Sequence, residues 1–426
     1  MNFNNISRLR GEVKLLGDKS ISHRAIMLSS ISNGNSYIEN FLMGKDCLST
    51  VDCFRRMGVD ISIEKNNNVK VKGVGLRGLK SPYEYLDVGN SGTTIRLLMG
   101  ILAGQNFKST LVGDKSISKR PMNRVTNPLR DMGAIIQGRD DGNFTPITIE
   151  GGSLRGIEYN MPVASAQVKS AIILASLYAD SKTKITEASK SRNHTEIMLK
   201  AFGGDIKADK NEILINKVEN LYSQDIYVPG DISSAAFFMC ATSMIKGSEL
   251  LIKDVGLNPT RTGILDVLEK MNGNFEILNK RIICGEEIGD ILVRYSKLKA
   301  VEIGGELIPR LIDEIPIIAV LATQCEGTTI IKDANELKVK ESNRIKSVVS
   351  NLKAMGAKIE ELEDGMIIKG PTKLKGAYIE SFDDHRIAMA FSVASLIADG
   401  STHIDNLSCV NISFPQFFDI LKSIIR

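Results

Sequence analysis

The stretch Phe54-Arg55-Arg56-Met57-Gly58-Val59 joins the end of an apolar helical pattern to a glycine and then to an alternating segment. A glycine directly after the last apolar position supplies the left-handed residue that ends many helices. Alternation of apolar and polar residues is typical of a strand. The phrase therefore predicts a helix that stops at Met57 and is followed by a β-strand.

The same phrase returns along the whole chain, which turns a local signal into a prediction of the fold. The steps between successive Met, Phe or Ile positions are 75, 70, 69, 84 and 69 residues, at Met57, Met132, Phe202, Met271, Met355 and Ile424. The competing explanation, that Met-Gly is a common helix ending, accounts for one copy but poorly for six. Six units that each contain helices and strands predict an α/β protein with internal pseudo-symmetry.

Length and charge limit the classes of protein that fit. The chain has 426 residues, which is long for one domain and natural for two. Lys and Arg number 54 against 50 acidic residues, a net charge of only +4, so a nucleic-acid-binding surface is not expected. A turn at residues 228–231 precedes a long apolar helix that Asp231 or Ser233 would cap, and we expect the main crossover between two lobes there.

The cysteines and the apolar runs favour a cytoplasmic protein. None of the six cysteines forms a C-x-x-C pair or has a metal-like spacing to histidine, so no metal site is expected. Scattered thiols in a long chain fit a reducing compartment. We find no targeting segment at the start and no apolar run of membrane-spanning length, so no membrane association is expected.

Seven short strings place charged residues among small ones at expected helix N-termini. They cover residues 17–24, 89–96, 164–170, 191–195, 313–316, 338–344 and 383–390. Each string alone is explained by an ordinary cap, such as Thr93 or Ser165, or by a solvated charged face. Helix N-termini attract anions, and Arg and Lys bind carboxylate and phosphate groups. Together the strings predict a site for a small substrate with several negative charges.

These strings identify a family resemblance. GDKSISHRA, GNSGTTIRL, KRPM, ASAQVKSA, RNHTE, VKESNR and DDHRIAMA, in this order, resemble the 5-enolpyruvylshikimate-3-phosphate synthases (3-phosphoshikimate 1-carboxyvinyltransferases) over nearly the whole chain. The resemblance implies an α/β fold of two lobes, each with three βαβαββ units, that exchange strands. Carried over, residues 18–228 form a continuous lobe on the shikimate 3-phosphate side. Residues 1–17 and 229–426 form a discontinuous lobe on the phosphoenolpyruvate side.

The resemblance also implies the reaction. The family transfers the enolpyruvyl group of phosphoenolpyruvate to the 5-hydroxyl of shikimate 3-phosphate and releases phosphate, the penultimate step to chorismate. No cofactor or metal is expected, and the partners are these two small molecules, with no nucleic acid. A monomer is expected. Glyphosate competes for the donor subsite in this family, and Gly92 leaves room for it.

The implied site residues fall into three sets. Shikimate 3-phosphate ligands are Lys19, Ser20, Arg24, Ser165, Gln167, Arg192, Asp313 and Lys340. Phosphoenolpyruvate ligands are Lys19, Gly92, Arg120, Gln167, Arg344 and Arg386. The catalytic set is Asp313 as general base, Glu341 as proton donor and acceptor at the methylene carbon, and Lys19 in support.

The chain departs from the family pattern at three positions. Ile412 stands where many relatives have a phosphate-binding lysine, Glu336 where some have an asparagine, and Ala166 where some have a serine. Two alternatives remain open. UDP-N-acetylglucosamine enolpyruvyl transferases typically have a Lys-Asn start and a loop cysteine, whereas this chain has Lys19-Ser20 and no cysteine in residues 112–123. A repeat scaffold that binds polyanions would need a continuous basic face.

Overall fold

A left-handed residue follows the helix in each of the first five copies of the repeated phrase. In the computed structural model, which describes residues 6–426, φ is positive at Gly58, Gly133, Gly203, Asn272 and Gly356. The preceding Met or Phe is at most 1% exposed in every copy. Helix α14 (Phe417–Ile424) ends at the sixth copy, where Ile424 is also buried. The predicted repeat is therefore confirmed, since a buried side chain marks the same point in all six units and a left-handed residue follows it in the first five.

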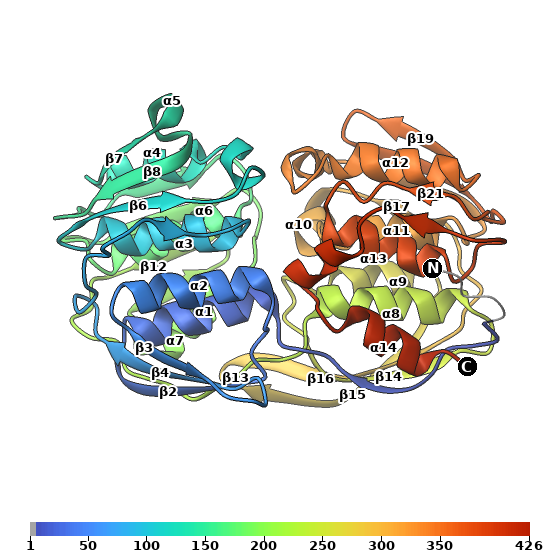
Figure 1. The fold of residues 1–426 in the computed structure, drawn as a ribbon, viewed down its shortest axis with the longest axis horizontal. Coiled ribbons are helices and arrows are strands. Elements are labelled where there is room, and N and C mark those ends of the chain that lie inside the picture. Colours follow the sequence, from blue (N-terminus) through green and yellow to red (C-terminus); the bar gives the residue numbers. More distant parts are fainter. Residues whose placement is uncertain (1–5) are drawn as a thin grey trace. The chain divides into compact units, whose positions relative to one another are not determined.

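The chain folds into two compact units, which we call lobes and describe separately (Figure 1). The N-terminal lobe comprises Gly17–Val228 and Ile283–Gly285. The C-terminal lobe comprises residues 6–16, Pro229–Ile282 and Glu286–Arg426. Which substrate each lobe serves stays a prediction.

The N-terminal lobe has three four-stranded sheets. In spatial order the first contains β13 (Ile226–Tyr227), β2 (Asn33–Glu39), β4 (Val69–Val74) and β3 (Asp60–Ile63). The second contains β5 (Leu86–Asp87), β6 (Lys108–Val112), β8 (Phe144–Glu150) and β7 (Ile135–Gly138). The third contains β9 (Glu158–Met161), β10 (Thr183–Glu187), β12 (Glu212–Ile215) and β11 (Ile206–Asp209).

The C-terminal lobe has two four-stranded sheets and one smaller sheet. The first contains β1 (Arg10–Lys14), β14 (Glu249–Gly256), β16 (Glu286–Arg294) and β15 (Asn274–Ile283). The second contains β17 (Glu302–Ile303), β18 (Gly327–Ile331), β20 (Gly365–Gly370) and β19 (Lys358–Leu362). The third contains β21 (Tyr378–Ile379) and β22 (His403–Ile404), in parallel.

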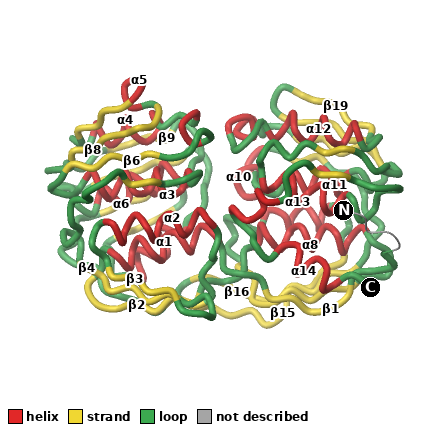
Figure 2. Tube along the Cα trace, viewed as in Figure 1, coloured by secondary structure: helices red, strands yellow, loops and turns green. Residues whose placement is uncertain are grey.

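One connection pattern underlies all six units. The first two strands in the spatial order given above are parallel in every sheet, and in the five four-stranded sheets the second of them pairs antiparallel with the third. This is the βαβαββ order, shortened to two strands in the sixth unit. The predicted α/β class with three units per lobe is confirmed, and Figure 2 shows helices and strands interleaved in both lobes.

Two strands join sheets that are distant from them in sequence. β1 pairs with β14, with Arg10 opposite Glu249, so the start of the described chain completes a sheet of the C-terminal lobe. β13 pairs with β2, with Ile226 opposite Ile38, and completes the first sheet of the N-terminal lobe. Both pairs are parallel, which requires a long connection rather than a hairpin.

The first helix of each unit is buried on nearly all sides. These helices are α1 (Lys19–Ser30), α3 (Gly92–Ala103) and α6 (Ala166–Ser176) in one lobe, and α8 (Ile232–Met244), α11 (Ile315–Ala322) and α13 (His385–Ala394) in the other. A helix that is apolar all round belongs in a core. Among residues 6–426, no helix combines the length and the apolar character needed to cross a membrane.

The second helix of each unit ends at the repeated phrase and covers a sheet. These helices are α2 (Lys45–Arg56), α4 (Asn123–Asp131), α7 (His194–Ala201), α9 (Gly263–Lys270) and α12 (Arg344–Ala354), with α14 in the last unit. Figure 1 shows α1 and α2 side by side above the sheet of β2, β3 and β4. The short helices α5 (Arg139–Gly142) and α10 (Ile308–Leu311) lie in connections.

We predict that Gly133→Ala destabilises the N-terminal lobe by about 1 kcal/mol, because an L-residue in the left-handed region carries a cost of that order. A methyl group there would meet nothing closer than 3.4 Å, so space is not the limit. Gly152→Ala is the matched control: it lies in the same lobe, has no neighbour within 4 Å and has no positive φ. The midpoint of urea unfolding should fall to a lower urea concentration for Gly133→Ala only. Equal shifts of the midpoint in both variants would contradict the explanation.

Candidate active site

The candidate residues from the sequence divide between the lobes and gather at the starts of the buried helices. Lys19, Ser20, Arg24, Gly92, Arg120, Ser165, Gln167 and Arg192 lie in the N-terminal lobe. Asp313, Lys340, Glu341, Arg344 and Arg386 lie in the C-terminal lobe. A helix start has backbone N–H groups without partners inside the helix, so polar side chains are needed there.

Helix α1 presents Lys19 and Ser20 in its first turn. The Asp18 carboxylate caps the helix by accepting from the backbone N–H of Ile21 at 2.9 Å. The Lys19 ammonium forms an ion pair with Asp46, which lies in the first turn of α2. Lys19 is therefore held by a side chain from the neighbouring helix.

Arg24 lies one turn further along α1 and is buried. Its Nε donates to Thr195 Oγ1 at 2.6 Å and its Nη2 to Ser170 Oγ at 2.7 Å. Its Nη1 donates to the carbonyl of Ser20 at 2.9 Å. Arg24 thus joins the start of α1 to α6 and α7, which brings three of the predicted strings together.

Helix α3 begins at Gly92, one residue before Thr93, which was expected to cap it. Ser91, not Thr93, is the N-cap: its hydroxyl accepts from the backbone N–H of Thr94 at 3.1 Å. The hydroxyl of Thr93 accepts instead from Gln167 Nε2 at 3.1 Å. Because Arg96 Nη1 donates to Gln167 Oε1, both ends of the Gln167 amide are fixed by α3.

Gly92 lies against two guanidinium groups. A Cβ atom at this position would come within 3.1 Å of Arg120 Nη1 and 3.3 Å of Arg96 Nη1. Arg120 directly follows a 3-10 turn at Ile117–Lys119 and is largely buried. The absence of a side chain at Gly92 therefore lets the Arg120 guanidinium lie close to the start of α3.

A chain of hydroxyl groups connects His23 to the α3 cap. His23 Nδ1 lies 2.7 Å from Thr50 Oγ1, which lies 2.8 Å from Thr94 Oγ1, and Thr94 donates to Ser91 Oγ at 2.6 Å. Burial, aided by the charges of Lys19 and Arg24, holds the pKa of His23 well below its usual range. The imidazole is therefore neutral at physiological pH, and the chain ties the starts of α1 and α3 to α2 without a buried charge.

The last two N-terminal strings lie at α6 and α7. Ser165 caps α6, as predicted, by accepting from the backbone N–H of Val168 at 3.4 Å. Arg192 follows the buried Ser191 and precedes α7 by one residue. Both positions are therefore helix starts in the same lobe as Lys19 and Arg24.

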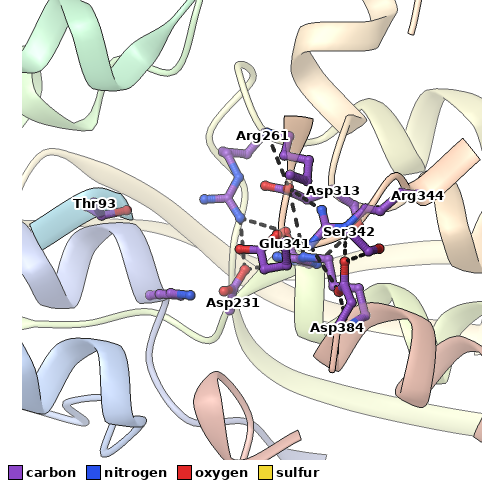
Figure 3. A network of polar contacts seen from close by, with 12 residues as sticks. Thr93, Asp231, Arg261, Asp313, Glu341, Ser342, Arg344 and Asp384 are labelled. Atoms are coloured by element: carbon purple, nitrogen blue, oxygen red, sulfur yellow. Dashed lines mark hydrogen bonds and ion pairs between the residues drawn. The ribbon is translucent and has the colours of Figure 1, made fainter. Parts of the chain in front are cut away.

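In the C-terminal lobe, Arg344 is the centre of the site (Figure 3). Its side chain is 1% exposed, and three carboxylates surround it. Nε donates to Asp384 Oδ2 at 2.8 Å, Nη2 to Glu341 Oε2 at 2.6 Å and Nη1 to Asp313 Oδ1 at 3.2 Å. The two carboxylates expected to be catalytic are therefore fixed relative to each other by one rigid guanidinium.

Asp313 also faces two further cations. Lys340 Nζ lies 3.9 Å and Arg386 Nε 3.8 Å from its Oδ1. Arg386 Nη1 donates to the Asp313 carbonyl at 3.2 Å. All five candidates of this lobe are thus brought together around Asp313 and Arg344.

Asp384 was missed as a site residue, although its string was noticed. It caps α13 by accepting from the backbone N–H of Arg386 at 2.9 Å and also accepts from Ser342 Oγ at 3.1 Å. Burial opposes its ionisation most strongly, but the charge of Arg344, the neighbouring His385 and the hydrogen bond from Arg344 together outweigh burial and lower the pKa of the Asp384 carboxyl. An acid directly before an expected helix start is the signal that could have identified it.

The same balance acts on Arg344. Burial alone would favour the neutral guanidine, but the charges of Asp384 and Glu341 outweigh it and raise the pKa of Arg344. Arg344 is therefore a permanent cation whose position Asp384 sets from behind. Glu341 and Asp313 contact its remaining edges.

Ile412 is the position where many relatives have a lysine. Ile412, at the end of a 3-10 turn, packs against the apolar core of the C-terminal lobe. In the part of the chain that the structure describes, no group of three or more His, Cys, Asp or Glu side chains is arranged to hold a metal ion.

Comparisons with known proteins agree over the whole chain. The family model described as EPSP synthase (3-phosphoshikimate 1-carboxyvinyltransferase) matches residues 3–421. A relative of that enzyme name from Geobacillus thermodenitrificans is 56% identical and covers 99% of this chain and 98% of its own length. One from Thermoanaerobacter pseudethanolicus is 58% identical, with 96% of each covered. A solved EPSP synthase structure from Acinetobacter baumannii has a TM-score of 0.89 at 43% identity, covering 99% and 97%.

We predict that His23→Asn changes how stability depends on pH. Below pH 6.5 the unfolded chain binds a proton on His23 that the folded protein excludes, so the wild type loses up to about 1.4 kcal/mol per pH unit as pH falls. The variant lacks this loss, so the difference in unfolding free energy between the two proteins should narrow from pH 7 to pH 5. A difference that stays constant from pH 8 to pH 5 would contradict a neutral, buried His23.

Proposed function

The chain belongs to the EPSP synthase family, an enzyme family of the shikimate pathway, and we propose the parts that its residues take in that family's reaction. The reaction transfers the enolpyruvyl group of phosphoenolpyruvate to the 5-hydroxyl of shikimate 3-phosphate and releases phosphate. The observation that carries the proposal is the Arg344 centre, where both acid–base candidates share one buried guanidinium. The monomeric state and the cytoplasmic location remain part of the proposal.

The two alternatives are not favoured. The relatives that match at 56% and 58% identity carry the name of the shikimate enzyme, not of a UDP-N-acetylglucosamine transferase. A polyanion-binding scaffold would not need Asp313 and Glu341 held against a buried arginine, because burying charges is costly unless they are paired.

For shikimate 3-phosphate we propose the ligands predicted from the sequence. They are Lys19, Ser20, Arg24, Ser165, Gln167, Arg192, Asp313 and Lys340. Support comes from the contacts of Arg24, which hold the Ser20 backbone and the start of α6. Since three nitrogens of Arg24 already donate to protein groups, we expect it to shape the subsite as much as to bind the ligand.

For phosphoenolpyruvate we propose Lys19, Gly92, Arg120, Gln167, Arg344 and Arg386. Arg344 contacts Asp313 and Glu341 through Nη1 and Nη2, so a bound carboxylate or phosphate would have to share or replace one of these contacts. That exchange couples donor binding to the position of the two acids. Gly92 contributes by leaving Arg120 close to the start of α3.

The acid–base steps then follow from the arrangement. Asp313 removes the proton of the 5-hydroxyl as the oxygen attacks carbon two of phosphoenolpyruvate, while Glu341 protonates carbon three. The tetrahedral intermediate loses phosphate, which takes up the proton held by Asp313, and Glu341 takes back a proton from carbon three, which restores the double bond. Lys19 supports these steps as a cation from the N-terminal lobe. Arg344 holds both carboxylates before the donor binds.

We predict that phosphate is released only when shikimate 3-phosphate and phosphoenolpyruvate are both present.

Asp313→Asn and Glu341→Gln keep most hydrogen bonds but lose the acid–base function, so turnover should fall by about 10²–10⁴-fold, the usual contribution of acid–base catalysis. Asp399→Asn is the matched control, because this exposed carboxylate of the same lobe forms an ion pair with the exposed Lys373.

Two outcomes would count against the proposal. Phosphate release with UDP-N-acetylglucosamine in place of shikimate 3-phosphate would overturn the reaction. Wild-type turnover in a variant that melts normally would remove that residue from the mechanism while leaving the reaction intact.

We predict that Gly92→Ala raises KM for phosphoenolpyruvate by about tenfold, the effect of one badly placed methyl group. The new Cβ would lie 3.1 Å from Arg120 Nη1, so the guanidinium has to move. Glyphosate should inhibit the wild type in competition with phosphoenolpyruvate and the variant more weakly. Gly152→Ala, with no neighbour within 4 Å, is the control. Weak inhibition of the wild type, or unchanged constants in the variant, would refute the assignment of Gly92.

A further inference from the structure

A buried ion-pair cluster in the N-terminal lobe has no part in the contacts proposed above. Lys169 is 1% exposed, and its ammonium lies 2.9 Å from Glu187 Oε2 and 2.7 Å from Glu196 Oε1. The ammonium also donates a hydrogen bond to the carbonyl of Ser191 at 3.3 Å. An ammonium has three protons, and Lys169 directs them at three buried acceptors, which come from β10, from α7 and from the segment between them.

The cluster fixes the segment that carries Arg192. Glu187 ends β10, and its Oε1 accepts from both the backbone N–H and the hydroxyl of Ser191. With the Lys169 contact, the N–H, C=O and side chain of Ser191 are all bound to two buried charged groups. The next residue is Arg192, so the backbone from which this long side chain starts is held in place.

The same lysine belongs to the helix that begins at Ser165. The backbone N–H of Lys169 donates to the carbonyl of Ser165 at 3.0 Å, in the first turn of α6. Gln167 and Ser170, its neighbours on α6, contact α3 and Arg24. Lys169 thus links the start of α6 to the segment that carries Arg192.

We propose that Lys169, Glu187 and Glu196 are positioning residues that set the placement of Arg192 relative to Ser165 and Gln167. The inference rests on the proposed function, in which Arg192, Ser165 and Gln167 bind shikimate 3-phosphate. An arginine and a helix start that bind the same multiply charged group must lie at a fixed distance from each other. A displacement near 1 Å can lower the rate of a well-positioned reaction by about 10²-fold. A buried, directional cluster holds such a separation better than a mobile surface loop.

The test is a double-mutant cycle between Lys169→Met and Arg192→Ala, with kcat and both KM values measured. Lys169→Met should raise KM for shikimate 3-phosphate by about tenfold and leave KM for phosphoenolpyruvate nearly unchanged. In the Arg192→Ala background the same substitution should have little further effect, because it acts through Arg192. Lys169→Arg should recover part of the affinity.

The controls separate positioning from general stability. Lys184→Met makes the same change on β10 at an exposed pair with Glu212 and should leave all constants unchanged. If Lys169→Met does not fold, Ser191→Ala, which removes only the hydroxyl contact to Glu187, decides the question through a smaller rise in the same KM.

Each outcome points to one conclusion. The proposal is overturned if Lys169→Met lowers the melting temperature but leaves KM for shikimate 3-phosphate unchanged. It is also overturned if Lys169→Met raises that KM as much in the Arg192→Ala background as in the wild type. If Arg192→Ala alone leaves that KM unchanged, the assignment of Arg192 fails instead, and the cluster cannot act through it.

Discussion

Six buried helices impose the constraint on which the rest of the structure depends. Each is apolar enough to lie in a core, yet its first turn has N–H groups that no residue of the helix can satisfy. The chain meets this demand with Asp18, Ser91, Ser165, Asp231 and Asp384, whose side chains cap five of the six. Because caps, cations and small residues must therefore concentrate at these ends, the packing of the core already determines where anions can bind.

The C-terminal lobe shows how a buried charge is made useful. Arg344 is enclosed, and only paired carboxylates make that burial acceptable. Asp384 takes the position behind it and at the same time caps α13, so it fixes both the guanidinium and the backbone of Arg386. The edges of Arg344 that remain point at Asp313 and Glu341. One cation thereby organises two acids that would otherwise repel each other.

The sequence predicted what depends on local order and missed what depends on distant partners. The repeat was visible because Met57, Met132 and three of their counterparts precede a left-handed residue, and a buried apolar residue followed by such a residue is a local feature. Thr93 was expected as a cap, but Ser91 has the same chemistry, and helix boundaries read from a sequence are uncertain by a residue or two. The pairing of Lys169 with Glu196, like that of Arg344 with Asp384, joins separate segments and has no periodic signal. Strand exchange was expected only from the family resemblance, since alternation predicts a strand but not its neighbour.

The exchange of β1 and β13 also bears on how the chain folds during synthesis. β2, β3 and β4 leave the ribosome long before β13, so the first sheet of the N-terminal lobe has an open edge until residue 227 is made. β1 waits longer still, because its partner β14 begins at Glu249. Closing such distant pairs carries an entropic cost before any contact rewards it, and an open edge invites wrong partners. The first sheet of each lobe therefore cannot be completed in strict order from the N-terminus, because one of its strands pairs with a strand that is distant in sequence.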